Sequence, residues 1–178
     1  MSSSNNYYDL DDILTDAEKI PCRFNITVPG LGYLEGNPGK PIQKDTKVEL
    51  PLWLAEILAI LNISEESSEN FIDLSDPDFI NVKVISAMKT SPISVDLHKL
   101  LPNYYSMVEK WCLMFNDTIL IENVMNMLKE RAFEINNFAN NANKQISNEF
   151  MYTLDEFEKK LFKKTLESNK LMRKWLKE

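Results

Sequence analysis

The chain has 178 residues, of which 44% are hydrophobic and 26% are charged, as in an ordinary globular protein with one domain or two small ones. The formal net charge of −7 is unevenly spread: residues 155–178 hold eight Lys/Arg against five Asp/Glu, which gives +3, so the remainder carries −10. An acidic body argues against wrapping of duplex DNA, which requires the neutralisation of several phosphates, and it is compatible with docking on basic protein surfaces.

Cysteine content and hydropathy argue against a secreted or membrane protein. Cys22 and Cys112 are too few and too far apart to form a disulfide framework, so we expect reduced, buried thiols in an intracellular protein. The N-terminus is polar and then acidic, unlike a signal peptide. The longest apolar run, 50–61, is interrupted by Pro51 and Glu56 and is shorter than the ~20 residues that span a bilayer.

The N-terminal region begins with a helical turn and a strand. Residues 7–14 predict one or two turns of helix, with Leu10, Ile13 and Leu14 on one face. Residues 19–28 then alternate apolar and polar side chains, which predicts a strand with one buried face. Its apolar positions are Ile20, Cys22, Phe24, Ile26 and Val28.

A turn-rich stretch follows and leads into the rest of the chain. It contains all four glycines of the protein, Gly30, Gly32, Gly36 and Gly39. Between these turns, residues 31–34 predict a second short strand. The alternation at 48–50 predicts another strand, and the apolar run that follows predicts a buried helix starting at Pro51, because proline is well tolerated at the first helical position.

The remainder of the chain predicts helices. Segments 78–89 and 94–101 carry apolar residues at helical spacing, and from 103 onward there is neither glycine nor proline. Residues 116–118 break one apolar stripe and supply an N-cap for the next helix. That helix repeats apolar residues at alternating spacings of four and three, at Ile121, Met125, Leu128, Ala132, Ile135 and Ala139.

The apolar arc of this long helix is wide. Leu120, Val124, Met127 and Phe138 extend it sideways, which indicates neighbours on two sides. The Asn-rich segment 136–148 predicts a loop, and 150–177 predicts a final helix. We therefore expect a mainly α protein with a small N-terminal β domain (α+β): residues 1–50 form the β domain and residues 51–178 form the helical domain.

The lone histidine, His98, is the only candidate catalytic base. It follows Asp96 at a spacing of two, but no serine or cysteine nucleophile stands at a recognisable spacing from it. A structural role is the simpler interpretation, because histidine is often partly buried and hydrogen-bonded.

Metal and phosphate motifs are incomplete. Asp9, Asp11 and Asp12 lack the sixth-position glycine and twelfth-position glutamate of a calcium loop. The glycines match neither the dinucleotide fingerprint nor the P-loop. We therefore expect no enzyme activity, no cofactor and no metal.

The last predicted helix has a basic face. Lys159-Lys160 and Lys163-Lys164 form pairs along it, and favourable i,i+4 spacing to Asp155 and Glu156 offers them acidic partners. A net +3 is small beside the charge of established nucleic-acid-binding domains, so a direct role in single-stranded DNA binding is the alternative hypothesis and any DNA contact is expected to be indirect or weak.

Several motifs, taken in order, resemble a known family. Residues 7–14 (YYDLDDIL), 20–24 (IPCRF), 29–35 (PGLGYLE), 50–55 (LPLWLA) and 95–98 (VDLH) are similar to the family of GINS subunits called the third "partner of Sld-five", in a yeast-type form. GINS is a eukaryotic DNA replication complex, and the resemblance covers most of residues 7–115.

This resemblance implies a fold and a function. GINS is a heterotetramer of related subunits, each with a helical bundle domain and a small β domain, and in this subunit the β domain comes first. The complex joins the MCM ring and the Cdc-forty-five protein in the nuclear replicative helicase, where the MCM ring hydrolyses ATP. The resemblance therefore implies a non-catalytic scaffold whose partners are the other three GINS subunits, the MCM ring and the Cdc-forty-five protein.

Apolar faces wider than one thin core requires would be buried against sister subunits, because obligate interfaces resemble a domain core cut in half. The candidate structural or interface residues are Trp53, Trp111, Leu120, Met127 and Phe138. Truncation of either tryptophan to alanine is expected to cost ~3–5 kcal/mol of stability if the ring lies in the core, and to impair assembly if it lies at a subunit interface.

Overall fold

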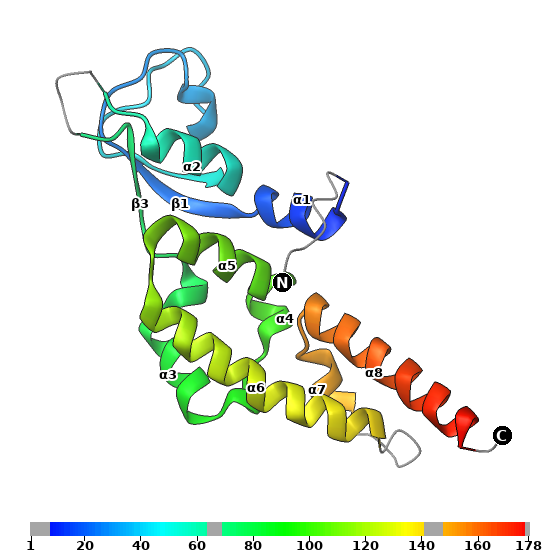
Figure 1. The fold of residues 1–178 in the computed structure, drawn as a ribbon. Helices are drawn as coiled ribbons and strands as arrows, with labels where there is room; N and C mark the ends of the chain where they lie inside the picture. Colours follow the sequence, from blue (N-terminus) through cyan, green and yellow to red (C-terminus); the bar gives the residue numbers. More distant parts are fainter. Residues whose placement is uncertain (1–7, 64–68, 141–147, 177–178) are drawn as a thin grey trace. The chain divides into compact units, whose positions relative to one another are not determined.

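The computed structural model describes residues 8–63, 69–140 and 148–176, and the chain divides into two compact units, Met1–Pro77 and Asp78–Glu178 (Figure 1). This division lies later than the boundary at 50/51 expected from the sequence. The difference arises because the helix that follows residue 50 packs on the strands of the first unit, so it belongs to that unit's core.

A three-stranded antiparallel sheet forms the centre of the first unit. Strand β1 (Lys19–Phe24) lies between β2 (Lys47–Pro51) and β3 (Ile72–Leu74). The register pairs Cys22 with Val48 on one side and with Leu74 on the other. The alternation expected for this strand is confirmed over its first half, where Ile20, Cys22 and Phe24 are all buried.

Beyond Phe24 the expected strand is replaced by a loop. Ile26 and Val28 are only half-buried, and Val28 pairs with Ile42 in an isolated bridge. The strand expected at 31–34 is wrong: Gly32–Glu35 forms a 3-10 helix (η1). Gly36 ends it in the left-handed conformation at φ 77°, and its N–H donates to the carbonyls of Gly32 and Tyr33.

Two helices accompany the sheet. Helix α1 (Leu10–Ala17) lies three residues later than the segment 7–14 expected from the sequence, and its N-cap is Asp9, whose carboxylate accepts a hydrogen bond from the Asp11 N–H. Helix α2 (Leu52–Ile60) packs against α1 and the strands. Pro51 is the last residue of β2 and occupies the N-cap position of α2, so the helix itself begins at Leu52.

The expectation that α2 is a buried helix is wrong for the chain by itself. Only Leu52 and Ala55 are buried, whereas the other apolar side chains of α2 are partly or largely exposed. Apolar residues lie on every side of α2, but the small sheet covers only one side of the helix.

The second unit is helical, and its long central helix contacts most of the others (Figure 1). In chain order its elements are η2 (Asp78–Ile80), α3 (Val82–Thr90), η3 (Pro92–Ser94), α4 (Leu97–Leu100), α5 (Tyr104–Phe115), α6 (Thr118–Asn140), α7 (Asn148–Tyr152) and α8 (Glu156–Trp175). Helix α6 packs against α3, η3, α5 and α8, which confirms that its wide apolar arc meets more than one neighbour. The expected N-cap is also present, since Asp117 accepts a hydrogen bond from the Leu120 N–H at 3.0 Å.

The buried face of α6 differs from the stripe expected for it. The residues that are buried are Leu120, Val124, Met127, Arg131, Ile135 and Ala139. Ile121 and Met125, which the periodicity placed in the core stripe, are exposed. The buried side of α6 therefore includes Arg131, a charged residue that a search for apolar periodicity does not select.

The single helix expected over 150–177 is instead two helices. Leu154 is buried between α7 and α8, and Asp155 caps α8 by accepting a hydrogen bond from the Phe157 N–H at 3.0 Å. Glu158 completes a capping box by accepting from the Asp155 N–H. The loop expected at 136–148 is wrong for residues 136–140, which belong to α6, and residues 141–147 lie outside the described residues.

Candidate protein-interaction site

The first candidate surface lies on α2 and is called here the α2 surface. It consists of the exposed apolar residues Trp53, Ile57 and Ile60, whose spacing of four and three places them along one side of the helix, together with exposed Leu61, the residue that follows the helix. The side chain of Trp53, the largest of these residues, is 52% exposed. A row of large apolar side chains facing water is typical of a surface that another protein covers.

The second candidate surface is a hollow between α5 and α6 in the second unit, called here the α5–α6 groove. Its volume is about 390 Å³, and its walls are almost entirely apolar. The α6 wall contains Ile121 and Met125, which explains why these two members of the expected stripe are not in the core. On the α5 wall, Leu113 is 80% exposed. Helix α6 thus carries two apolar faces, one packed within the unit and one open.

A buried ion pair joins two helices of the second unit. Arg131 of α6 donates from Nε to one carboxylate oxygen of Glu158 at 2.7 Å and from Nη2 to the other at 2.9 Å, and both side chains are fully buried. This bidentate geometry is the strong form of an arginine–carboxylate pair. It ties α6 directly to the first turn of α8.

The remaining donors of Arg131 satisfy backbone carbonyls. Its Nη1 donates to the carbonyls of Pro92 at 3.0 Å and Val95 at 2.9 Å, at either end of η3. Its Nη2 also donates to the Thr153 carbonyl at 3.3 Å, and the Phe150 ring covers the guanidinium at 5.2 Å. One side chain on α6 therefore contacts both the segment around η3 and residues 150–158, which are distant from each other in sequence.

Glu158 and Asp155 extend this network to α5. The Tyr105 hydroxyl donates to Glu158 Oε1 at 2.8 Å, and the Tyr104 N–H donates to Asp155 Oδ1 at 2.7 Å. Burial raises the pKa of Tyr105, and the neighbouring Glu158 charge raises it further, so this hydroxyl stays protonated. Burial also raises the pKa of Asp155 to about 6, against the backbone N–H groups that favour its charged form.

The sequence analysis did not identify Arg131 and Glu158. A signal was nevertheless present: Arg131 lies four residues after Met127 and four before Ile135, in the buried row of α6. The capping-box spacing of Asp155 and Glu158 was the second signal, because it marks a helix start inside the segment predicted to be one helix.

The structure places the five candidate residues in two settings. Trp53 belongs to the exposed α2 surface. Trp111, Leu120 and Met127 are buried within the second unit, and Trp111 packs edge-on against Phe79 at 6.1 Å. Phe138 is half-buried and stacks on Phe150 at 5.3 Å.

The residues considered for chemistry have structural partners. Asp96 caps α4 by accepting from the Lys99 N–H at 3.0 Å, and the Nδ1 atom of exposed His98 lies 3.3 Å from Lys159 Nζ. His98 and Asp96 are thus each engaged with another residue. Cys22 and Cys112 are buried free thiols, as expected.

Neither a metal cluster nor a membrane span emerges from the part of the chain that the structure describes. Within it, His, Cys, Asp and Glu side chains do not gather in threes in a way that would hold a metal ion. The helices within it are either too short or too polar to cross a bilayer.

Sequence comparison agrees with the division into two units. Residues 8–60 match the family model described as the PSF3 N-terminal domain, and residues 79–177 match the GINS complex protein helical bundle domain. A small β unit followed by a helical bundle of this type defines the chain as a GINS subunit.

Relatives along almost the whole length identify which subunit family this is. A protein of Debaryomyces hansenii is 71% identical over 98% of this chain and 99% of its own length, and one of Candida albicans is 66% identical over 97% of each. A protein of Saccharomyces cerevisiae is 40% identical over 96% of this chain and 97% of its own length. All three are named "DNA replication complex GINS protein PSF3". The chain therefore belongs to the PSF3 family of GINS subunits, which confirms the resemblance found in the sequence.

Proposed function

We propose that this chain is a non-catalytic scaffold that assembles with the other three GINS subunits into a heterotetramer. The observation that carries this proposal is the α2 surface, a row of large apolar side chains that the first unit leaves open to water. The α5–α6 groove provides a second open apolar face in the second unit. Membership of the PSF3 family supplies the class of partner that would cover these faces.

We further propose that the assembled complex joins the MCM ring and the Cdc-forty-five protein in the nuclear replicative helicase. The family membership supports this role, and the engagement of His98 and Asp96 in structural contacts supports a function without catalysis by this chain. ATP hydrolysis then belongs to the MCM ring, and the chain contributes binding surfaces alone.

Co-expression with the other three GINS subunits tests the assembly. We expect the four proteins to copurify in equal amounts by size-exclusion chromatography and native mass spectrometry, and the chain produced alone to self-associate through its open apolar faces. A monodisperse monomer that does not copurify with those subunits would contradict the proposal. Affinity purification of the tetramer with the MCM ring and the Cdc-forty-five protein then tests the helicase role separately.

One observation favours single-stranded DNA binding as a second candidate function. Trp175 is exposed on α8 next to Arg173 and Lys174, and single-stranded DNA sites combine stacking rings with cations. Lys159, however, is already paired with Glu156 at 2.7 Å. Fluorescence anisotropy with an oligothymidylate compares the tetramer with a variant reversed to Glu at Lys159, Lys160, Lys163 and Lys164. Salt-dependent binding that the reversal abolishes would establish direct contact through the lysine pairs. Undetectable binding, or binding that is unchanged both by this reversal and by Trp175→Ala, would exclude this candidate.

A further inference from the structure

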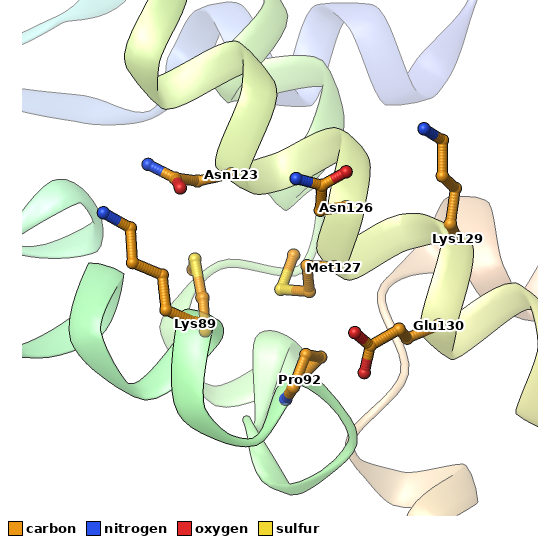
Figure 2. Close-up of a pocket in the computed structure, with 8 residues that line it drawn as sticks. Lys89, Pro92, Asn123, Asn126, Met127, Lys129 and Glu130 are labelled. Carbon is orange, nitrogen blue, oxygen red and sulfur yellow. The ribbon is translucent and has the colours of Figure 1, made fainter.

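A second hollow of the helical unit has chemistry unlike that of the apolar surfaces. It lies where the last turn of α3 and the start of η3 face the middle of α6, and its volume is about 360 Å³ (Figure 2). It is called here the α3–α6 pocket. Met88, Pro92 and Met127 are buried and give it an apolar floor. Methionine side chains adapt readily to a bound group, which suits a floor of this kind.

The wall residues concentrate hydrogen-bond donors at one end. Figure 2 shows the Lys89 ammonium and the Asn123 amide extending toward the same end of the pocket. The Asn123 Nδ2 atom is buried and has no acceptor among the described residues. Lys89 likewise makes no ion pair in the part of the chain with described side chains. A buried amide donor without an acceptor is costly, so this end of the pocket favours a ligand that brings acceptor oxygens.

The charges around the pocket restrict the ligand further. Figure 2 shows the Glu130 carboxylate on the opposite side, beside Pro92, while the Lys129 side chain extends away from the others. The lining thus contains two lysines, Lys89 and Lys129, and one carboxylate, Glu130, which gives it a net charge of +1, and of the two lysines Lys89 extends toward Asn123. A ligand with one negative charge fits this arrangement, whereas a chain of phosphates would meet Glu130 and the acidic body of the protein.

We propose that the α3–α6 pocket binds a single glutamate or aspartate side chain presented by a partner protein. The carboxylate accepts hydrogen bonds from Lys89 Nζ and Asn123 Nδ2, and the methylene stem of the ligand packs on the methionine floor. The cation and the unpaired amide both favour a carboxylate over a neutral amide, because charge-assisted hydrogen bonds are roughly twice as strong as neutral ones. This chemistry is a property of the pocket itself and does not depend on the assembly proposed above.

Capped peptides test the pocket directly. The full chain, labelled with ¹⁵N and held at a concentration at which size-exclusion chromatography shows a monomer, is titrated with a capped hexapeptide that has one central glutamate among alanines, and with the same peptide carrying glutamine. We expect the glutamate peptide to shift the Asn123 side-chain amide signals and to bind about tenfold more tightly than the glutamine peptide, as expected for the loss of a charge-assisted hydrogen bond. An absence of shifts at Asn123, or equal affinity for the two peptides, would overturn the proposal.

Variants separate this pocket from general attraction to lysines. Lys89→Gln and Asn123→Leu should each weaken the glutamate peptide about tenfold, while Lys83→Gln, an exposed position on the same helix α3, should leave its affinity unchanged. Lys89 is itself exposed, so its variant keeps the test valid even if Asn123→Leu disturbs folding. An equal effect of Lys83→Gln would contradict the proposal. An oligothymidylate that shifts the same signals at lower concentration than the glutamate peptide would assign the pocket to nucleic acid instead.

Discussion

At the scale of single residues, Arg131 connects α6 to η3 and to the first turn of α8 in the second unit. A buried guanidinium carries a large desolvation cost, and here two carboxylate oxygens and several carbonyls compensate for it. The pair also fixes where α8 starts, because Glu158 belongs both to the ion pair and to the capping box of that helix. The position of the first turn of α8 therefore depends in part on this ion pair.

Arg131→Met tests this role. The change leaves the Glu158 carboxylate buried without its partner, so the free energy of unfolding of the full chain should fall by about 3–5 kcal/mol in urea titrations. Adding Glu158→Gln removes the uncompensated charge and should restore part of the loss. Lys129→Met, an exposed position on the same helix, is the matched control and should change stability by about 0.5 kcal/mol or less. A similarly small effect of Arg131→Met would contradict the argument.

Asp155 adds a dependence on pH. Its pKa is about 6 in the folded chain and about 3.9 when unfolded, so the folded state binds the proton more tightly. The stability that Asp155 contributes is therefore full below about pH 4 and is lost as the pH rises toward 6. Relative to Asp155→Asn, the free energy of unfolding of the unmodified chain should fall by about 1–3 kcal/mol across this window. Urea unfolding of both proteins between pH 4 and 7 measures this difference, and parallel curves would refute it.

At the scale of elements, the turn-rich loop of the first unit depends on one close backbone approach. A Cβ added at Gly32 would lie 2.3 Å from the Lys40 carbonyl oxygen and 2.4 Å from that of Asn37, so the loop closes only around glycine. A Cβ at Gly30, by contrast, has open space within 4 Å, although the backbone there has a positive φ of 80°.

We therefore expect Gly32→Ala to destabilise the full chain more than Gly30→Ala. Gly30→Ala should cost about 1–2 kcal/mol, because alanine tolerates the left-handed conformation poorly. Gly32→Ala should cost more, because the carbonyls of Asn37 and Lys40 must move and lose their hydrogen bonds within this loop. Urea titration followed by circular dichroism measures both variants. The reverse order would show that the loop can rearrange around an added methyl group.

The elements that the sequence predicted well are those whose own periodicity decides their structure. The alternation around Cys22 marked the central strand, and the asparagine and aspartate before Thr118 marked the start of α6. The errors arose where contacts distant in sequence decide. The break before α8 depends on Asp155 reaching Tyr104, and the buried row of α6 depends on Glu158 neutralising Arg131. Apolar periodicity records neither contact, so Ile121 and Met125 were assigned to the core in place of the arginine.

At the scale of the whole molecule, each unit has a closed core and an open apolar surface. In the first unit the sheet covers only one side of α2, and in the second unit α6 packs inward on one face and lines the α5–α6 groove with another. A scaffold subunit requires this combination, because the cores fix its shape while the open surfaces remain available for partners. The periodicity of the sequence revealed the apolar faces, but only the packing showed which of them remain open.

Trp111 and Trp53 distinguish a core residue from a residue of an open apolar surface. Trp111 is buried against Phe79, so Trp111→Ala should lower the free energy of unfolding of the full chain by about 3–5 kcal/mol. Trp53 lies on the exposed α2 surface, so Trp53→Ala should cost about 1 kcal/mol or less in the same measurement.

If the α2 surface is the interface with the other GINS subunits, Trp53→Ala should nevertheless weaken copurification with them. An interface tryptophan is commonly worth at least about 2 kcal/mol, which corresponds to roughly thirtyfold in affinity. Full assembly of Trp53→Ala with those subunits would remove the α2 surface from the interface and leave the α5–α6 groove as the surface to test next.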